Sequence, residues 1–310
     1  MKRFKNILFV ADRQDGISAA LDRAVALSQT NSARLTVMDV IPDAGLADVV
    51  RRTYAVDLNA QIRQQRLEAL EALVHPHTAA DIPVYTKVTT GITFLEVVRA
   101  VLRNGHDLVM KVAQYDAGLT PWLFGSTDLH LLRKCPCPVW IDRPGAASAY
   151  HRLLAAVDPF DDESGDLQRL ILDLATSLAG REHATLDVVH AWELPGESML
   201  ANGRGRIPRN ELDLMLDRTE RRHREALDTL LGPYGLDSIS DNVHLVKGRP
   251  AKIISAYARE QQTDLIVMGT LGRAGVPGLI IGNTAEDVLR QAQTAVLAVK
   301  PVAFVSPVTC

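Results

Sequence analysis

The chain has 310 residues, a formal net charge of −3 and 47% hydrophobic residues. This length is about twice that of a usual domain of ~150 residues, and the charge gives no overall attraction to nucleic acid or anionic lipid. No apolar run approaches the ~18 residues of a membrane span, and the run at residues 7–10 is too short for a signal-peptide core. We therefore expect a cytoplasmic protein with two domains.

Strands and helices are predicted to alternate along the first half. The long helix is expected near residues 57–75. Short apolar runs without polar alternation are typical of strands that are buried on both faces. Such runs predict strands near residues 6–11, 34–41, 83–88, 107–112 and 138–141.

The second half follows the same order. Apolar runs predict strands at 153–157, 185–191, 243–246, 265–268 and 295–299. Helices are predicted from Leu167 onward, at 211–231, at 251–260 and at about 284–291. Leucines and an isoleucine between Leu167 and Leu178 form one helical stripe, and Gly180 is expected to end that helix.

The two halves repeat one pattern. With an offset of 157 residues, Gly91 aligns with Gly248, Asp107 with Asp264, and Gly125 with Gly282. The period is too long for a solenoid and indicates a duplicated domain. We predict domains at 1–143 and 150–301, joined by a short linker.

Strands that alternate with helices predict parallel pairing with right-handed crossovers. The expected fold is α/β, with two tandem doubly wound five-stranded parallel sheets flanked by helices. Ligands of such sheets lie beyond the carboxyl ends of the strands, where the winding direction switches. Asp158 and Gly269 both follow predicted strands, so both can face one crevice.

A glycine-rich loop follows the strand at 265–268. Gly269 and Gly272 stand near its start, Gly282 stands at its end, and Arg273 adds a positive charge. Glycines let backbone amides approach a phosphate, and a following helix presents its N-terminus to an anion. Asn283 or Thr284 is expected to cap that helix or to donate to a phosphate. Turn formation alone would also explain these glycines.

The spacing Gly269-x2-Gly272-x9-Gly282 resembles the ATP-binding signature of the universal stress protein family. The strands before Asp158 and at 295–301 resemble the family's first and last strands. The stretches 105–111, 131–136 and 282–286 are most similar to the tandem, two-domain E-type members. This resemblance implies a Rossmann-like fold of the adenine-nucleotide α-hydrolase type, with pairing of the two final strands.

The resemblance also implies roles for matching residues. Asp158 and Pro159 would face adenine or ribose, and Ala191 would offer backbone contacts to adenine. Met268 and Gly269 would lie beside the ribose. The phosphates of ATP or another adenine nucleotide, with or without Mg²⁺, would be surrounded by Gly272, Arg273, Gly282, Asn283 and Thr284. Asn283 stands where the family has Ser or Thr; it retains an amide donor but not the hydroxyl.

The first half departs from this signature. Val112 and Tyr115 stand at the positions of Gly269 and Gly272, and only Gly125 and the two residues after it remain. Tyr115, Trp122 and Phe124 are bulky. We therefore expect a degenerate nucleotide site, filled as plain core or open to an apolar ligand.

Other motifs are weaker. Cys135 and Cys137 flank Pro136 and are expected to be free thiols, with a redox or metal role as the alternative. His106 is expected in a turn, His75 and His77 in a solvated loop, and 161–163 in a solvated loop or a magnesium site.

No Walker-A lysine, nucleophile elbow or zincin motif is present. Three functions remain open: a non-catalytic stress-response protein that binds an adenine nucleotide, a scaffold that has lost nucleotide binding, and a weak ATPase. Unknown protein partners and a chain–chain homodimer are also expected, without nucleic acid or membrane.

Overall fold

The computed structural model describes most of the chain. The described residues are 4–12, 17–42, 58–77, 82–114, 124–146, 149–160, 165–203, 206–270 and 282–309.

The first half contains five strands and their helices within these ranges. The strands are β1 (Asn6–Val10), β2 (Arg34–Ile41), β3 (Val84–Thr90), β4 (Leu108–Val112) and β5 (Val139–Asp142). The helices are α1 (Ser18–Asn31), α3 (Leu58–Val74), α4 (Thr93–Asn104) and α5 (Ser126–Lys134).

The second half repeats this order. Its strands are β6 (Arg152–Ala156), β7 (Thr185–Trp192), β8 (Val243–Lys247), β9 (Leu265–Gly269) and β10 (Ala295–Val299). Its helices are α6 (Asp166–Glu182), α7 (Glu197–Asn202), α8 (Arg209–Leu231), α9 (Pro250–Glu260) and α10 (Asn283–Gln291). All ten predicted strands are present, whereas the short helix α7 was not predicted.

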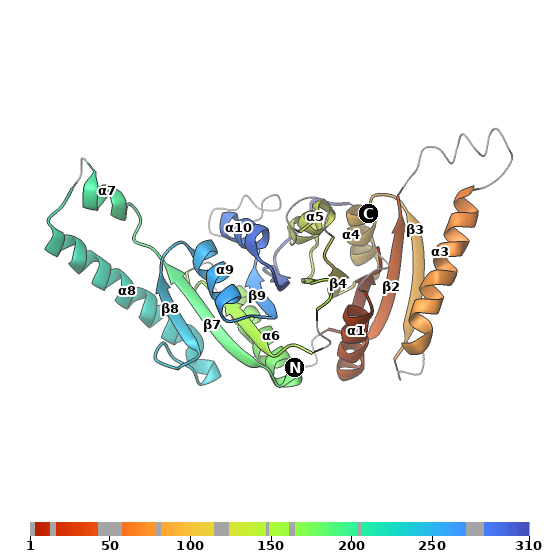
Figure 1. Cartoon of the computed structure of the whole chain (residues 1–310), viewed down its shortest axis with the longest axis horizontal. Coiled ribbons are helices and arrows are strands. Elements are labelled where there is room, and N and C mark those ends of the chain that lie inside the picture. The colour runs from red at the N-terminus through yellow and green to blue at the C-terminus, as the bar shows by residue number, and fades with distance from the viewer. Residues whose placement is uncertain are drawn as a thin grey trace.

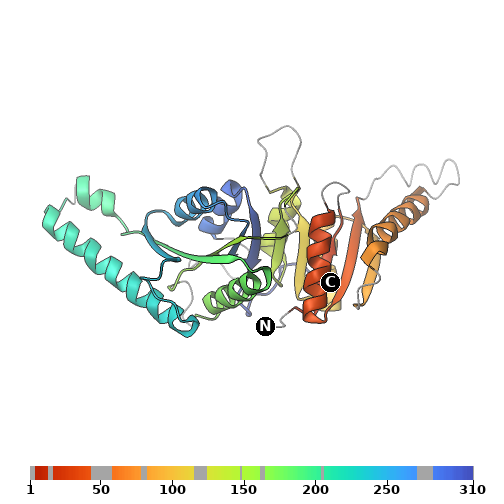
Figure 2. The same cartoon turned by 60° about the horizontal axis from the view of Figure 1, so that its bottom comes forward.

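The strands form a single ten-stranded sheet in the order β3-β2-β1-β4-β5-β10-β9-β6-β7-β8. Within each half all pairs are parallel, which confirms the predicted doubly wound fold. The expected pairing of the final strands is also confirmed, because β5 and β10 are antiparallel neighbours with Trp140 opposite Leu297. The two halves therefore lie side by side in one elongated molecule (Figures 1 and 2).

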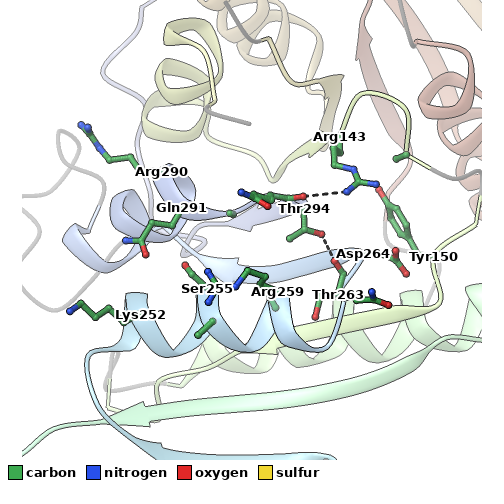
Figure 3. Close-up of a pocket in the computed structure, with 16 residues that line it drawn as sticks. Arg143, Tyr150, Lys252, Ser255, Arg259, Thr263, Asp264, Arg290, Gln291 and Thr294 are labelled. Atoms are coloured by element: carbon green, nitrogen blue, oxygen red, sulfur yellow. Dashed lines mark hydrogen bonds between the residues drawn. The ribbon is translucent and has the colours of Figure 1, made fainter. Parts of the chain in front are cut away.

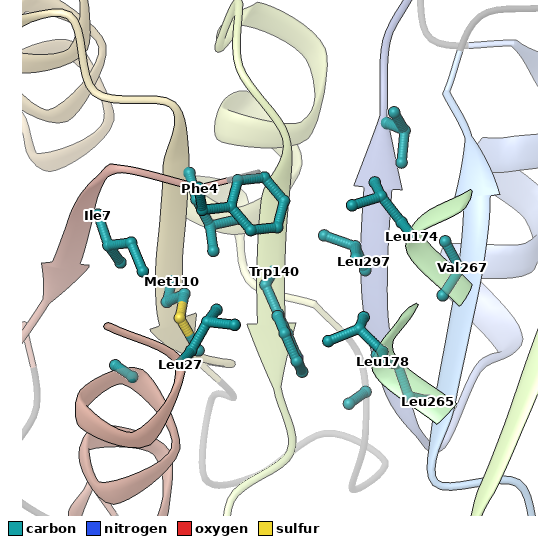
Figure 4. Packing of buried hydrophobic residues seen from close by; sticks show 14 of the residues in the cluster. Phe4, Ile7, Leu27, Met110, Trp140, Leu174, Leu178, Leu265, Val267 and Leu297 are labelled. Atoms are coloured by element: carbon teal, nitrogen blue, oxygen red, sulfur yellow. The ribbon is translucent and has the colours of Figure 1, made fainter. Parts of the chain in front are cut away.

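Apolar side chains cover both faces of this sheet. One buried cluster lies under α1, α3, α6 and α8, and a second lies under α4, α5, α9 and α10. Figure 4 shows the first cluster where the halves meet: Trp140 on β5 stands between Met110 on β4 and Leu297 on β10. Trp140 is fully buried, so the junction is part of the hydrophobic core.

The end of α6 differs from the prediction. The helix continues past Gly180 to Glu182, and His183 adopts the left-handed conformation that closes it, with φ 53°. A Cβ at Gly180 would meet no atom within 4 Å, so nothing in the described surroundings requires glycine there. The sequence rule was wrong because a non-glycine residue can occupy the left-handed cap at a modest energetic cost.

Candidate functional site

The site predicted in the second half is assigned to the carboxyl ends of two central strands. In the register of β6 and β9, Ala156 is opposite Met268. Asp158 follows β6 after one residue, and Gly269 is the last residue of β9. Because β7 and β9 lie on opposite sides of β6, this is the point where the winding direction switches. The structure thus brings Asp158, Met268 and Gly269 to the same end of the sheet, as predicted.

The loop after β6 is held by hydrogen bonds. The Asp158 backbone N–H donates to Oε1 of Gln168 on α6 at 2.9 Å, and Gln168 is buried. The Asp158 Oδ1 accepts from the Phe160 backbone N–H at 3.1 Å, so the carboxylate spans Pro159 in an Asx turn. Asp158 and Pro159 remain half-buried. The carboxylate is therefore fixed in orientation while it stays accessible at the end of the strand.

Helix α10 begins directly beside the end of β9. The Gly282 backbone N–H donates to the Thr270 carbonyl at 2.8 Å, and Gly282 is the N-cap residue. No side chain caps the helix, so the expectation that Asn283 or Thr284 caps it was wrong. Both lie in the first turn and are exposed. Their backbone N–H groups have no acceptor one turn earlier within the helix, which leaves this terminus suited to an anion.

The end of β9 packs closely against helix α6. A Cβ built on Gly269 would come within 3.1 Å of Cδ2 of Leu167 on α6. Tight helix–sheet contact is one of the reasons for glycine at such a turn. Two of the predicted phosphate contacts, Gly272 and Arg273, lie outside the described residues, as does the possible magnesium stretch at 161–163.

The remaining predicted site residue is Ala191, near the carboxyl end of β7. It is half-buried and pairs with Val246 of β8. Beside it, the Nδ1–H group of His190 donates to the Val157 carbonyl at 3.0 Å, and its Nε2 is 2.8 Å from Nδ1 of His223 on α8. The residue before Ala191 thus ties β7 both to the strand that leads to Asp158 and to helix α8.

Aromatic rings surround this histidine pair. The His223 ring meets Phe160 edge-on at 4.7 Å and stacks on Trp192 at 5.8 Å, measured between ring centroids. Sequence analysis missed this cluster, because His190 and His223 are far apart in the chain and neither belongs to a motif. The cluster links the loop after β6 and the end of β7 to α8.

The corresponding place in the first half is filled by charged side chains. Lys111 on β4 is fully buried, and its Nζ lies 2.5 Å from Asp128 Oδ1 on α5 and 3.5 Å from Asp12 Oδ2 after β1. Burial raises the pKa of Asp12, and the nearby Lys111 ammonium partly offsets that rise. Lys111 and Asp128 align with Met268 and Ala285 of the second half, so a charged pair replaces an apolar one.

The Asp128 carboxylate also occupies the start of helix α5. Its Oδ2 accepts from the backbone N–H of Gln114 at 2.9 Å and of Gly125 at 3.2 Å. The Gln114 side chain donates to Asp12 Oδ2 at 2.5 Å. Gly125 aligns with Gly282, so an internal carboxylate stands at the helix start that no side chain caps in the second half. Of the predicted bulky residues, Phe124 packs against the second apolar cluster, and Tyr115 and Trp122 lie outside the described residues.

Within the described ranges, no group of three or more His, Cys, Asp or Glu side chains is placed to hold a metal ion. His77 Nε2 lies 3.4 Å from Asp22 Oδ1. Asp107 accepts from the backbone N–H groups of Lys5 and Asn6, so the dipeptide it forms with His106 belongs to a turn before β4.

The cysteines of the described chain are free thiols, as predicted. Cys135 and Cys137 are buried, with their sulfur atoms 3.5 Å apart. Cys310 lies outside the described residues. No helix in the described parts of the chain is long and apolar enough to cross a membrane.

Comparison with known proteins agrees with this duplicated architecture. The model of the universal stress protein family matches residues 3–143 and again residues 149–300. The chain therefore belongs to the universal stress protein family and carries two copies of its domain.

Several relatives match the chain over nearly their whole length. Universal stress protein E of Escherichia coli K12 is 27% identical over 319 residues, which cover 99% of this chain and 98% of that protein. The Universal stress protein E homolog of Haemophilus influenzae is 25% identical and covers 96% and 98%. A putative universal stress protein from Pseudomonas aeruginosa UCBPP-PA14 has a solved structure with a TM-score of 0.70, 25% identity, and 97% and 95% coverage.

Proposed function

We propose that the second half binds ATP or another adenine nucleotide and that the first half does not. The observation that carries this proposal is the difference between two equivalent places in one chain. At the carboxyl ends of β6 and β9 lie Asp158 and the start of α10, which no side chain caps. At the carboxyl ends of β1 and β4, Asp12, Lys111 and Asp128 already satisfy one another.

The proposed binding mode takes the role of each residue from the resemblance to the family's ATP-binding signature. Asp158 and Pro159 face adenine or ribose, and the backbone near Ala191 lines the base. Met268 and Gly269 lie along the ribose. The loop glycines, Gly272 and Gly282, with Arg273, Asn283 and Thr284 surround the phosphates, because backbone N–H groups at a helix start favour negative charge.

The protein would act as a stress-response factor through its conformation or through partner proteins, without turnover. Phosphoryl transfer needs a positioned metal and charge stabilisation at the transferring group, and the sequence offers only Arg273 and the acidic stretch 161–163 for these roles. A weak ATPase is the second candidate, since Arg273 lies in the glycine-rich loop and the acidic stretch 161–163 follows Asp158 and Pro159 in sequence. A scaffold without nucleotide is the third.

Native mass spectrometry followed by calorimetric ATP titration, with magnesium and with EDTA, tests the proposal. We expect one adenine nucleotide per chain. Gly282→Val should weaken binding at least about tenfold, because the added side chain displaces phosphate from the helix start. Gly180→Val is the matched control, since Gly180 is exposed on α6 with no atom near its Cβ position.

The possible outcomes separate the candidates. Two nucleotides per chain would overturn the assignment of the first half. No binding at millimolar ATP would favour the scaffold. Phosphate release that disappears in Arg273→Ala, in protein that still binds ATP, would establish an ATPase.

A further inference from the structure

Two thiols lie in contact between the end of α5 and the start of β5. The chain bends at Pro136 and Cys137, and the Sγ atoms of Cys135 and Cys137 are 3.5 Å apart. Both thiols are free and buried, and both belong to the second apolar cluster. The bend shortens the Cα separation below the ~7 Å of a fully extended segment, which is the upper limit for a disulfide. The pair is therefore placed to form an S–S bond with a small shift.

A buried cation lies beside this pair. Lys300, directly after β10, is 5% exposed, and its ammonium acts electrostatically on both sulfur atoms. Burial opposes ionisation of Cys135, but the Cys137 S–H group and the Lys300 ammonium together lower the pKa of the Cys135 thiol. The hydrogen bond with Cys135 and burial raise the pKa of the Cys137 thiol. The two thiols are thus unequal, and Cys135 is the one that ionises first to the nucleophilic thiolate.

The equivalent place in the second half has no thiols. With the offset of 157 residues, Ala292 and Thr294 align with the two cysteines. In Figure 3 the Thr294 side chain is engaged with the backbone, since its Oγ1 donates to the Thr263 carbonyl at 2.5 Å. A methyl group and a hydroxyl cannot form a disulfide. The dithiol therefore belongs to the first half alone.

The C-terminal tail, residues 301–309, covers this place. The Lys300 Nζ lies 4.9 Å from the centroid of the Phe304 ring. Ser306 Oγ donates at 2.7 Å to the carbonyl of Lys134, which directly precedes the first thiol. Figure 1 shows the chain end beside α4 and α5. The tail thus contacts the residues on either side of the thiol pair.

The tail is held along one side only. Phe304, Ser306 and Val308 are half-buried, whereas Val305 and Pro307 between them are exposed. Val308 packs against the second apolar cluster, which includes both cysteines. Chain ends with a single buried side open locally at a lower free energy than core strands. Opening of the tail would let small molecules reach the thiols without unfolding of the sheet.

We propose that Cys135 and Cys137 form a reversible dithiol site, which small hydroperoxides oxidise to a disulfide when the C-terminal tail opens. Cys135 is the attacking thiol, Cys137 is the resolving thiol, and Lys300 is a positioning residue that keeps a positive charge beside Cys135. The inference does not depend on nucleotide binding, because none of these residues is assigned to the nucleotide.

The reaction has two steps. The Cys135 thiolate attacks one oxygen of hydrogen peroxide; an S–O bond forms, the O–O bond breaks and hydroxide leaves, which gives a sulfenic acid. The Cys137 sulfur then attacks Cys135 Sγ; the S–S bond forms, the S–O bond breaks, and the departing hydroxide takes the Cys137 proton to give water. The two thiols are oxidised by two electrons, and the peroxide is reduced.

The position of the pair selects the class of oxidant. A disulfide between residues two positions apart closes a small ring, and strained disulfides are readily reduced. Its formation therefore needs a strong oxidant, and a site beneath the tail admits a small one. Hydroperoxides meet both conditions, and a thiol reductant should reverse the reaction.

The first test treats the full chain with hydrogen peroxide and follows the intact mass. All samples carry Cys310→Ser, because this third thiol lies outside the described residues. We expect loss of two hydrogen atoms per chain, and dithiothreitol should restore the starting mass. In Cys137→Ser, a sulfenic acid at Cys135 should accumulate and be trapped by dimedone. Cys135→Ser should react at least about tenfold more slowly.

A matched pair of tail variants tests access. Val308→Asp places a charge against the apolar cluster, so it should open the tail and speed disulfide formation at least about fivefold. Val305→Asp makes the same change on the exposed side of the tail, where Val305 is 76% exposed, and should leave the rate unchanged. Circular dichroism and the unfolding midpoint check that both variants keep the fold.

Lys300 is tested in the Val308→Asp chain, where its contact with Phe304 no longer limits access. Lys300→Met should slow disulfide formation at least about fivefold, and Lys300→Arg, which keeps the charge, should restore the rate to within about twofold. Equal rates in Lys300→Met and its parent, or failure of Lys300→Arg to restore the rate, would remove Lys300 from the site.

Three results would overturn the proposal as a whole. The first is that both thiols resist peroxide even in Val308→Asp. The second is a gain of oxygen without loss of two hydrogen atoms, which would show oxidation of single thiols only. The third is equal rates in Val308→Asp and Val305→Asp, which would show that the tail does not control access.

Discussion

At the scale of single residues, the buried ion pair of Lys111 and Asp128 distinguishes the first half from the second. Both side chains are fully buried, and Asp128 bonds two backbone N–H groups as well as the ammonium. Removing one member of a buried ion pair leaves an uncompensated charge, which is more costly than removing both.

We expect Lys111→Met to lower the free energy of unfolding by about 3–5 kcal/mol. The double variant Lys111→Met, Asp128→Ala introduces the residues that the second half has at 268 and 285. It should recover about 2 kcal/mol or more of that loss. Urea denaturation of the single variants and the double variant measures this coupling. Additive effects would contradict the interaction described here.

Lys300 provides a pH-dependent test. Burial lowers the pKa of Lys300 from 10.5 to about 8, and the ammonium lies over the Phe304 ring at 4.9 Å. The unfolded chain therefore binds this proton more tightly than the folded chain, so the charged lysine destabilises the fold below pH 8 and the cost disappears as the pH rises toward 10.5.

Lys300→Met should accordingly stabilise the protein by about 2 kcal/mol at pH 7, after allowance for the lost cation–π contact. The difference between variant and wild type should shrink steadily between pH 8 and pH 10. Chemical denaturation at several pH values provides the measurement. A difference that does not change with pH would show that the Lys300 charge carries no such cost.

At the scale of elements, the strands were predictable and the details of the sites were not. Runs such as 153–157 and 265–268 are apolar without alternation because both faces of the sheet are covered, and few other structures produce that pattern. Lys111 interrupts such a run, and a lone lysine in a strand does not reveal its partner seventeen positions later. The histidine pair 190 and 223 was missed for the same reason.

The sequence correctly predicted, from Gly282, where α10 begins. It assigned the N-cap to the wrong residue. Gly282 is extended, with φ −61° and ψ 143°, and itself occupies the N-cap. Asn283 is therefore the first helical residue. The rule that Asn caps helices gave the right segment and the wrong residue, because glycine also occurs at this position.

This geometry predicts opposite effects of one substitution. Asn283→Asp places a negative charge in the first turn of α10, which should stabilise the helix by about 0.5 kcal/mol. The same charge should weaken ATP binding about tenfold or more through repulsion of the phosphates. Calorimetric titration and the unfolding midpoint measure the two effects separately. Asn283→Ser, which introduces the family's hydroxyl, serves as the control and should retain ATP binding. Unchanged ATP affinity in Asn283→Asp would show that the start of α10 does not contact the phosphates.

At the scale of the whole molecule, the antiparallel pairing of β5 with β10 makes one sheet from two halves. The junction is apolar on both faces, and Trp140 stacks on Tyr150 with ring centroids 5.9 Å apart. Glu286 on α10 also pairs with Arg133 on α5 at 2.9 Å, so helices of the two halves are linked directly. Separate domains on a flexible tether would share none of these contacts.

We therefore expect Trp140→Ala to destabilise both halves. Truncation of a buried Trp costs about 3–5 kcal/mol, and its neighbours belong to both halves. In differential scanning calorimetry, the wild type should unfold in one transition, and the variant should unfold at a lower temperature. Retention of the original transition by one half would show that the halves fold independently of the junction.

The junction between β5 and β10 has a consequence for how the protein can evolve. In a dimer of identical single domains, every substitution appears in both copies, so a change that closes one ligand site closes the other. Covalent fusion removes that constraint while the same edge pairing is retained. A lysine and an aspartate can then replace a methionine and an alanine in one copy alone. The two halves of this chain can therefore differ in function, whereas the two subunits of a symmetric dimer must have the same one.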